Sequence, residues 1–263
     1  MTRTSLIAGG LLSLVAATGA HAAAANRGAE QIIEKSIAAQ GGLSAWRGVK
    51  TLTTEGQLDA GGKPNHQLPY VLKQKRGHKS RLEITFKGQT SVQVYDGTQG
   101  WKLRPFLNRN ETEDYTPAEA KAAAASEELD GALVDYVAKG TQITIAGTEP
   151  VEGHAAYKLV LKRRDGEKHH VWIDTNTFLQ VKMDGEPRKI DGKMHDVVIY
   201  FRDYKNEHGL VVPHLQETVV EGVKNAEPYR MTVTKVTVNE SLDDALFSKP
   251  KAGAVVGDGT KKP

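Results

Sequence analysis

The sequence predicts a mainly β protein built on one large, strongly curved antiparallel sheet that helices cover. Short segments in which apolar and polar residues alternate, the pattern of half-buried strands, recur along most of the chain. The connections between them are short and contain Gly, Asp or Asn, which favours antiparallel neighbours in chain order. There are about eleven such segments, and a sheet of this size cannot lie flat, because its twist curls it toward a barrel.

The N-terminus has the pattern of a secretory signal peptide over residues 1–22. Arg3 supplies a positive charge, residues 6–17 form an apolar run, and residues 20–22 (Ala-His-Ala) match a small-x-small cleavage site. The alternative is a short transmembrane anchor, but the run is shorter than the ~20 residues that a spanning helix needs. We therefore expect cleavage after Ala22, within a few residues, and export to the periplasm.

Composition excludes several classes of protein. The chain has no cysteine, which excludes disulfides, thiolate metal sites and the lipid anchor that bacterial lipoproteins carry on an N-terminal Cys. The formal net charge of +3 falls to +2 once Arg3 is removed, because 35 basic residues become 34 against 32 acidic ones. A charge so close to balance argues against nucleic acid as a partner. The basic clusters at 73–76 and 162–164 are interpreted as solvated strand ends.

A helix is predicted near the start of the mature chain, over residues 27–40. Asn26 is a suitable N-cap, and the glycine pair at 41–42 ends the helix, because glycine accepts the left-handed conformation found there. Two strands are predicted to follow, over residues 49–59 and 66–76, with a loop that contains Gly and Pro between them.

The segment from Lys79 to Pro105 predicts an antiparallel meander. Apolar and polar residues alternate on either side of Gly88, and Asp96-Gly97 predicts a tight turn, because glycine accepts the positive φ that such turns need. We expect one apolar face and one solvated face. The apolar side chains of the meander are Leu82, Ile84, Phe86, Val92, Val94, Trp101 and Leu103.

A second helical region is predicted in the middle of the chain. Residues 116–119 (Thr-Pro-Ala-Glu) form a capping box with proline at the first helical position, and the helix is expected to run to about Glu128. A second helical piece is expected over residues 132–139. The apolar stripe at helical spacing contains Leu129, Leu133 and Val137.

The rest of the chain predicts strands, one short helical turn over residues 242–247 and a disordered C-terminal tail over residues 251–263. The mature folded domain therefore spans residues 23–250. The later strands are expected at 142–146, 156–162, 168–174, 178–183, 195–204, 212–221 and 229–239.

The sequence contains no recognisable catalytic motif. There is no nucleophile elbow, and scattered Ser and His residues do not define a triad. His169 and His170 are the most tempting metal ligands, but neighbouring side chains of a strand point to opposite faces and cannot chelate one ion. We therefore expect no enzyme activity, no metal site and no cofactor.

The chain resembles the LolA/LolB-like superfamily of periplasmic lipoprotein carriers, and more closely its outer-membrane lipoprotein-sorting members. The likeness covers residues 29–250. Its elements are the opening helix that ends at the glycine pair, the strand that leads from Lys75-Arg76 into residues 81–84, and the mid-chain helix. The most specific motifs are Tyr95-Asp96-Gly97 followed by Gly100-Trp101, and the closing Leu246-Phe247-Ser248-Lys249-Pro250.

This resemblance implies an unclosed β-barrel of about eleven antiparallel strands, with helices as a lid over a cavity for acyl chains. It also implies a gating role for Arg76, at the position of a basic residue that bonds to the lid; Ser80 stands where these carriers have an aromatic gate. The expected partners are a lipid or acylated lipoprotein and envelope membrane proteins, and we expect a monomer. The expected lining of the cavity is Leu82, Ile84, Phe86, Val92, Val94, Trp101, Leu103, Leu129, Leu133 and Val137.

Two other functions stay open at this point. The same fold serves as a protein-interaction or sensor module of the cell envelope, which reads proteins and carries no cargo. An enzyme with an unrecognised site is the second alternative.

Overall fold

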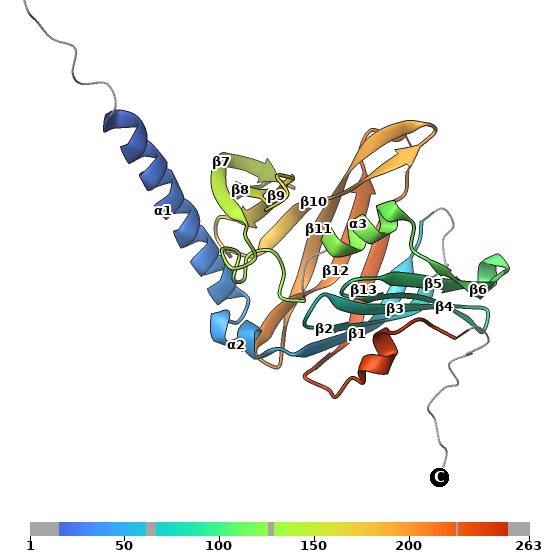
Figure 1. Cartoon of the computed structure of the whole chain (residues 1–263). Coiled ribbons are helices and arrows are strands. Elements are labelled where there is room, and N and C mark those ends of the chain that lie inside the picture. Colours follow the sequence, from blue (N-terminus) through green and yellow to red (C-terminus); the bar gives the residue numbers. More distant parts are fainter. Residues whose placement is uncertain (1–15, 62–66, 126–128, 225, 252–263) are drawn as a thin grey trace, which may run out of the picture.

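The structure is a computed structural model that describes residues 16–61, 67–125, 129–224 and 226–251. The predicted signal peptide lies outside these ranges up to residue 15, and the predicted C-terminal tail lies outside them from residue 252 onward. Strands dominate the described part of the chain (Figure 1).

All the strands form one antiparallel sheet of 13 strands in the order β6-β5-β4-β3-β2-β1-β13-β12-β11-β10-β9-β8-β7. Neighbours follow the chain in two runs, which meet where β1 pairs with β13. Because β6 and β7 do not pair, the sheet stays open, and the predicted fold class is confirmed. The strands are β1 (Thr51–Asp59), β2 (Gln67–Lys75), β3 (Lys79–Phe86), β4 (Gln89–Asp96), β5 (Gly100–Arg104), β6 (Arg109–Asp114), β7 (Gln142–Val151), β8 (His154–Lys162), β9 (Lys168–Asp174), β10 (Gln180–Ile190), β11 (Lys193–Glu207), β12 (Leu210–Val220) and β13 (Tyr229–Val238).

The helices are few and short apart from the first. α1 (Ala16–Ala39) starts before the predicted residue 27 and ends close to the predicted position, where Gly41 and Gly42 both have positive φ. α2 (Leu43–Gly48) follows at once. The others are the 3₁₀ helix η1 (Pro105–Leu107), α3 (Pro117–Ala125) and the 3₁₀ helix η2 (Asp244–Phe247).

The helix predicted over residues 132–139 is wrong. Residues 129–140, which we call the turn segment, form consecutive turns instead. Gly131 and Asp135 adopt the left-handed conformation, with φ of 73° and 51°, and a right-handed helix cannot continue through such residues. The apolar residues at helical spacing nevertheless pack inward, as described below.

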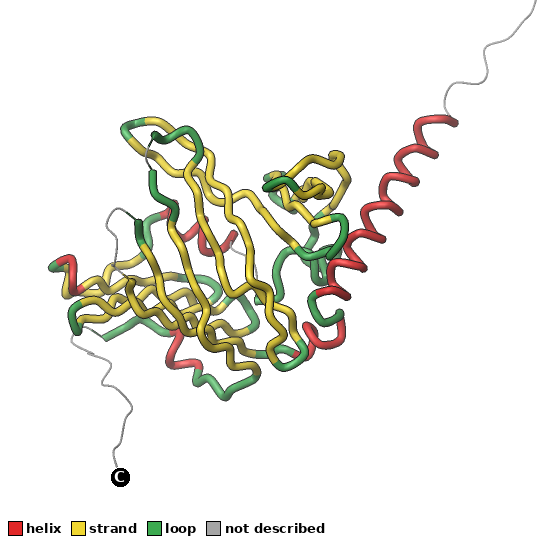
Figure 2. Tube along the Cα trace, turned by 180° about the vertical axis from the view of Figure 1, so that it is seen from behind, coloured by secondary structure: helices red, strands yellow, loops and turns green. Residues whose placement is uncertain are grey.

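The sheet is bent, and its two faces have different surroundings. Strands β1–β6 form one half of the bent sheet and β10–β13 the other, with α3 in the angle between them. The 3₁₀ helix η2 lies on the other side of β1–β5 (Figure 1). The view from behind shows the long strands β10–β13 crossing the molecule at a steep angle to β1–β6 (Figure 2). We call the face toward α3 concave and the face toward η2 convex. Residues directly opposite each other on neighbouring strands share a face, so the register assigns every strand residue to one of them.

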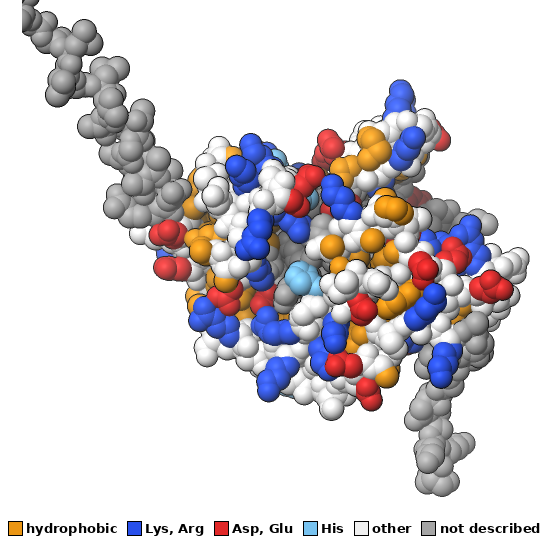
Figure 3. All heavy atoms as spheres, in the orientation of Figure 1, with side chains coloured by type: hydrophobic (Ala, Val, Ile, Leu, Met, Phe, Trp, Pro, Cys, Tyr) orange, Lys and Arg blue, Asp and Glu red, His pale blue; other side chains and the backbone are white. Residues whose placement is uncertain are grey.

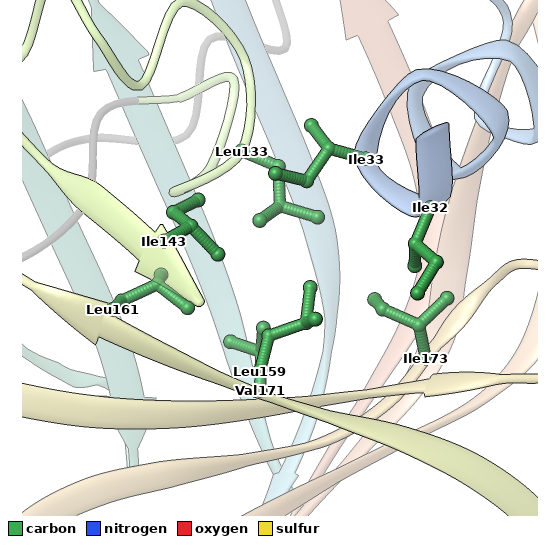
Figure 4. Close-up of a cluster of buried hydrophobic side chains, with 8 residues drawn as sticks. All are labelled: Ile32, Ile33, Leu133, Ile143, Leu159, Leu161, Val171 and Ile173. Atoms are coloured by element: carbon green, nitrogen blue, oxygen red, sulfur yellow. The ribbon is translucent and has the colours of Figure 1, made fainter. Parts of the chain in front are cut away.

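Two clusters of buried side chains lie on the concave face. The first joins α1 and the turn segment to β7–β9 (Figure 4); it contains Ile32, Ile33, Leu133, Ile143, Leu159, Leu161, Val171 and Ile173. The second joins α2 and the turn segment to the centre of the sheet; it contains Trp46, Val49, Leu52, Leu129, Val134, Leu210, Val212 and Val236. Side chains of the protein itself therefore fill the concave face at its β7–β9 end and beside α2.

The convex face of β4 and β5 has a core of its own beneath the C-terminal residues. Val92, Val94 and Leu103 pack against Leu242 and Phe247, and Phe247 is only 1% exposed. Burying a side chain of this size contributes about 1.5–3 kcal/mol, so this contact holds η2 firmly on the sheet.

Candidate functional site

A surface of half-buried apolar side chains covers the part of the concave face that the two clusters leave open. We call it the concave wall, and it extends from β1–β3 to β11 and β13. None of its members belongs to a buried cluster. They are Leu58, Leu68, Leu72, Leu82, Ile84, Phe86, Ile199, Phe201 and Met231.

The register makes this wall continuous across both halves of the sheet. Phe201 lies opposite Gln216, Gln216 opposite Met231, Met231 opposite Leu58 and Leu58 opposite Leu68, in one row over five strands. Figure 3 shows hydrophobic side chains gathered beside a hollow in the middle of this side of the molecule. The wall is thus one surface, and it is partly accessible to solvent.

The charged side chains of β1–β4, β12 and β13 all lie on the convex face. The concave positions of the same strands carry apolar or neutral polar side chains, together with the buried His214. An uncharged apolar surface that is partly accessible to solvent is typical of a ligand-binding surface. The charged residues on the convex face are Glu55, Asp59, Lys73, Lys75, Lys79, Arg81, Glu83, Asp96, Glu217, Arg230 and Lys235.

The meander does not have the single apolar face that its alternation predicts. The two-residue turn at Lys87-Gly88 places Phe86 opposite Gln89, so Leu82 lies opposite Gln93 and not opposite Val92 or Val94. Leu82, Ile84 and Phe86 therefore belong to the concave wall. The predicted lining residues Val92, Val94, Trp101 and Leu103 lie on the other face, in or against the core beneath η2.

The three lining residues predicted in the mid-chain region are also separated. Leu129 and Leu133 are buried in the two concave clusters, whereas Val137 is 70% exposed at the surface. The left-handed residues of the turn segment separate these side chains, which a continuous helix would have held on one stripe. The sequence did not single out the other members of the concave wall, which are Leu58, Leu68, Leu72, Ile199, Phe201 and Met231. The signal for them was the turn length, which decides which alternating positions share a face.

Beneath the turn segment there is a small cavity of about 20 Å³. A volume of this size has room for about one water molecule. The cavity lies between Trp46, Asp130, Leu133 and Gln180. A long apolar ligand therefore has no closed chamber here, and the open concave wall is the surface on which it can lie.

Ion pairs hold the turn segment in place. Arg76, directly after β2, donates to Asp130 Oδ2 over 2.7 Å and to the carbonyl oxygens of Trp46 and Val49 over 2.6 Å each. Lys139 Nζ lies 2.6 Å from Asp130 Oδ1, and the Asp130 side chain is only 2% exposed. Arg76 thus connects the sheet, α2 and the turn segment. The gating role that the resemblance implies for Arg76 stays a prediction.

α3 is attached to the concave face in a different way. Its capping box is confirmed, because Thr116 Oγ1 accepts from the Glu119 amide over 3.3 Å and Glu119 Oε2 accepts from the Thr116 amide over 2.8 Å. Lys102 Nζ of β5 lies 2.5 and 2.6 Å from the two carboxylate oxygens of Glu119. Burial acts to raise the pKa of Glu119, but the hydrogen bonds from Lys102 and Thr116 outweigh it and lower the pKa to about 2.

The histidines lie as the sequence analysis expected. On β9, His169 is opposite Leu161 and His170 is opposite Val160, so their side chains are on different faces. His170 Nδ1 lies 2.7 Å from Asp184 Oδ2. Within the described ranges, no three His, Asp or Glu side chains come close enough to hold a metal ion. In the same ranges, no helix has both the length and the apolar character needed to cross a membrane.

Comparisons by sequence give no relative: no family model matches the chain, and no curated protein matches it. Comparisons of structure give clear neighbours, each with a TM-score of 0.54 and covering 84% of this chain and 97% of the neighbour. They are a LolA superfamily protein from Nitrosomonas europaea (16% identity), a putative outer membrane lipoprotein-sorting protein domain from Vibrio parahaemolyticus (13%) and a DUF1329 family protein from Desulfovibrio piger (14%). The fold is therefore LolA-like, as the sequence motifs predicted.

Proposed function

We propose that this chain, which has the LolA-like fold, is a periplasmic carrier that binds the acyl chains of lipoproteins or other lipids on its concave wall. The observation that carries the proposal is the contrast between the faces of β1–β4, β12 and β13: their charged side chains lie on the convex face, whereas the concave wall is apolar and half-exposed. The folds of the structural neighbours and the names of two of them support the same assignment.

The energetics favour a lipid over a small polar ligand. Each CH₂ group that leaves water contributes about 0.8 kcal/mol, so an acyl chain lying along one row of the wall gains useful affinity without any polar contact. Because the wall is already folded and partly exposed, binding requires little rearrangement of the sheet. The proposed lining is Leu58, Leu68, Leu72, Leu82, Ile84, Phe86, Ile199, Phe201 and Met231.

Two movable covers give a route for loading and release. The turn segment is connected to the sheet through Arg76 and Asp130, and α3 is connected through Lys102 and Glu119. We propose that Arg76 gates the wall by holding the turn segment closed, and that an acceptor with greater burial for the cargo draws it out. Export by the predicted signal peptide would place the mature domain, residues 23–250, in the periplasm.

The test is to express the full chain in a Gram-negative host, purify it from the periplasm and analyse bound lipid by native mass spectrometry. Acylated species at about one per protein support the carrier. Empty protein that still forms a stable complex with an envelope protein would favour the interaction module instead.

A pair of variants on one strand locates the lipid. Leu82→Glu puts a charge on the concave wall, whereas Thr85→Glu puts the same charge on the convex face of β3. We expect lipid to be lost from the first variant and kept by the second, with both variants folded. Equal lipid content in the two variants would show that the concave wall is not the binding surface.

A further inference from the structure

Lys102 is a cation at an unusual place in the sheet. Its residue is only 7% exposed, and its side chain projects from β5 onto the concave face. In the register it continues a row that crosses the concave wall: Leu72 opposite Leu82, Leu82 opposite Gln93 and Gln93 opposite Lys102. With strands about 4.8 Å apart, the Lys102 backbone lies about 10 Å from that of Leu82. The row of uncharged side chains thus ends at the buried positive charge of Lys102, and Arg104, two residues further along β5, is paired with Glu113.

The partner of that charge belongs to the helix that covers it. Both Glu119 carboxylate oxygens face Lys102 Nζ, in the manner of a bound anion, and the Glu119 side chain remains 41% exposed. α3 buries little apolar surface: its sequence is largely alanine, and none of its described side chains is fully buried. The ion pair with Lys102 and the adjoining Tyr115 are its main attachments among the described residues. A second ion pair, from Lys121 Nζ to Glu167 Oε1 over 3.2 Å, is exposed at both side chains.

The other charges around Lys102 do not replace Glu119. Glu113 lies opposite Lys102 on β6, but its carboxylate accepts from Arg104 over 2.8 Å and from Arg109 over 3.3 Å. If α3 moved away, Lys102 would be left on the concave face without its carboxylate partner. A buried cation in that position is costly unless another anion takes the place of Glu119.

We infer that Lys102 is the head-group site for a long-chain amphiphile with one anionic head group, and that Glu119 occupies the site when the wall is empty. This inference rests on the proposed function, because the chain of the amphiphile lies on the concave wall. The cargo carboxylate or phosphate displaces Glu119, α3 swings off β5, and the acyl chain runs along Leu82 and Leu72. Because only an anionic head group can replace the Glu119 carboxylate at Lys102, loading is selective for anionic over neutral lipids.

The test compares two fluorescent probes that differ only in charge, cis-parinaric acid and its methyl ester, with the full chain. The measured quantity is the ratio of the two affinities. In Lys102→Met we expect the preference for the acid to fall about tenfold, since a charge-assisted contact is lost. In Glu119→Gln we expect the preference to rise several-fold, because the competing carboxylate is gone. Lys235→Met, which removes a similar ion pair with Glu55 on the convex face, should leave the ratio unchanged.

Each other outcome counts against the inference. If the acid-to-ester affinity ratio is the same in wild type, Lys102→Met and Glu119→Gln, Lys102 is not a head-group site. The proposed carrier function would then still stand. Displacement of the bound acid by acetate would mean that the site takes small anions and not amphiphiles. Failure of both probes to bind any of the proteins overturns the proposed function itself. If Lys102→Met does not fold by circular dichroism, the ratio for Glu119→Gln decides alone.

Discussion

The strands β3–β5 are covered on both faces, and the two covers are built on different principles. On the convex face, η2 buries Phe247 and Leu242 against Val92, Val94 and Leu103, and Arg81 and Lys75 bond to the carbonyl oxygens of Leu246 and Leu242. On the concave face, the alanine-rich α3 is held mainly by the ion pair between Lys102 and Glu119, with a second, exposed pair between Lys121 and Glu167. Apolar burial is hard to reverse, whereas another anion can replace one partner of an ion pair and keep the charge contact. The first cover is structural, and the second is suited to open.

The largest loss of stability is expected when the apolar contact of η2, the convex cover, is removed. Phe247→Ala should lower the free energy of unfolding by about 3–5 kcal/mol, the usual loss for deleting a buried phenyl ring. Urea unfolding followed by tryptophan fluorescence measures the change. Leu107→Ala is the control, because Leu107 is 55% exposed and its truncation should change the stability little. A loss below about 1 kcal/mol for Phe247→Ala would mean that η2 is not part of the core.

The alternation of apolar residues predicted the strands well, but it could not predict how their faces combine. β9 lies at the predicted residues 168–174, and the strands after it differ only at their ends. Which positions share a face depends on the length of each turn, and the turn at Lys87-Gly88 places four of the ten predicted lining residues on the convex side. Pairing between β1 and β13, residues far apart in the sequence, has no local signal at all.

Two further elements escaped prediction for local reasons. β6 has the sequence Arg-Asn-Glu-Thr-Glu-Asp, which contains no apolar alternation, because an edge strand is guarded by charge and buries little. The turn segment has apolar residues at helical spacing, but its left-handed Gly131 and Asp135 interrupt the helix. The ion pair between Lys102 and Glu119 joins a strand to a helix through tertiary contact, so the sequence indicated the capping role of Glu119 but not its pairing with Lys102. The lipid-lining role of the concave residues stays a prediction.

The turn segment provides an intermediate case between the two covers. It buries Leu129 and Leu133, as η2 buries Phe247, but its Asp130 also holds Arg76 and Lys139. Asp130→Ala leaves both cations without that carboxylate. We expect a loss of about 2 kcal/mol, below the 3–5 kcal/mol typical of a fully buried pair, because both cations partly face solvent. Urea unfolding of Asp130→Ala measures it, and Arg47→Ala, which breaks only the exposed pair with Asp135, should cost well under 1 kcal/mol.

The attachment of α3 can be weakened without touching its ion pair. A Cβ added at Gly100 would lie 2.0 Å from Cδ2 of Tyr115, so Gly100→Ala must displace the ring next to α3. We expect faster amide hydrogen exchange over residues 116–125 and a stability loss of about 1–3 kcal/mol. Gly48→Ala is the control, because no atom lies within 4 Å of its added Cβ and its φ is not positive. Unchanged exchange in Gly100→Ala would mean that Tyr115 does not position the helix.

The smallest effect is a release of α3 by acid. The pKa of Glu119 is about 2 in the folded protein and 4.5 ordinarily, so its stabilisation is complete above pH 4.5 and is lost as the pH falls toward 2. The hydrogen bond from Arg104 also lowers the pKa of Glu113, which lies opposite Lys102 on β6. NMR spectra of the α3 amides should show helix loss between these pH values in wild type.

η2, the convex cover, is the internal control for this titration, because its Asp244 also has a lowered pKa. Hydrogen bonds from Lys75 and Lys79 lower the pKa of Asp244 in η2, so both covers lose a charge contact in acid. Only α3 should detach, since Phe247 keeps η2 on the sheet after Asp244 is protonated. In Glu119→Gln the acid-induced change in the NMR signals of the α3 amides should disappear. The change caused by protonation of Asp244 in η2 should remain. If η2 and α3 are released together, apolar burial does not distinguish the two covers, and the concave helix is no more suited to open than the convex one.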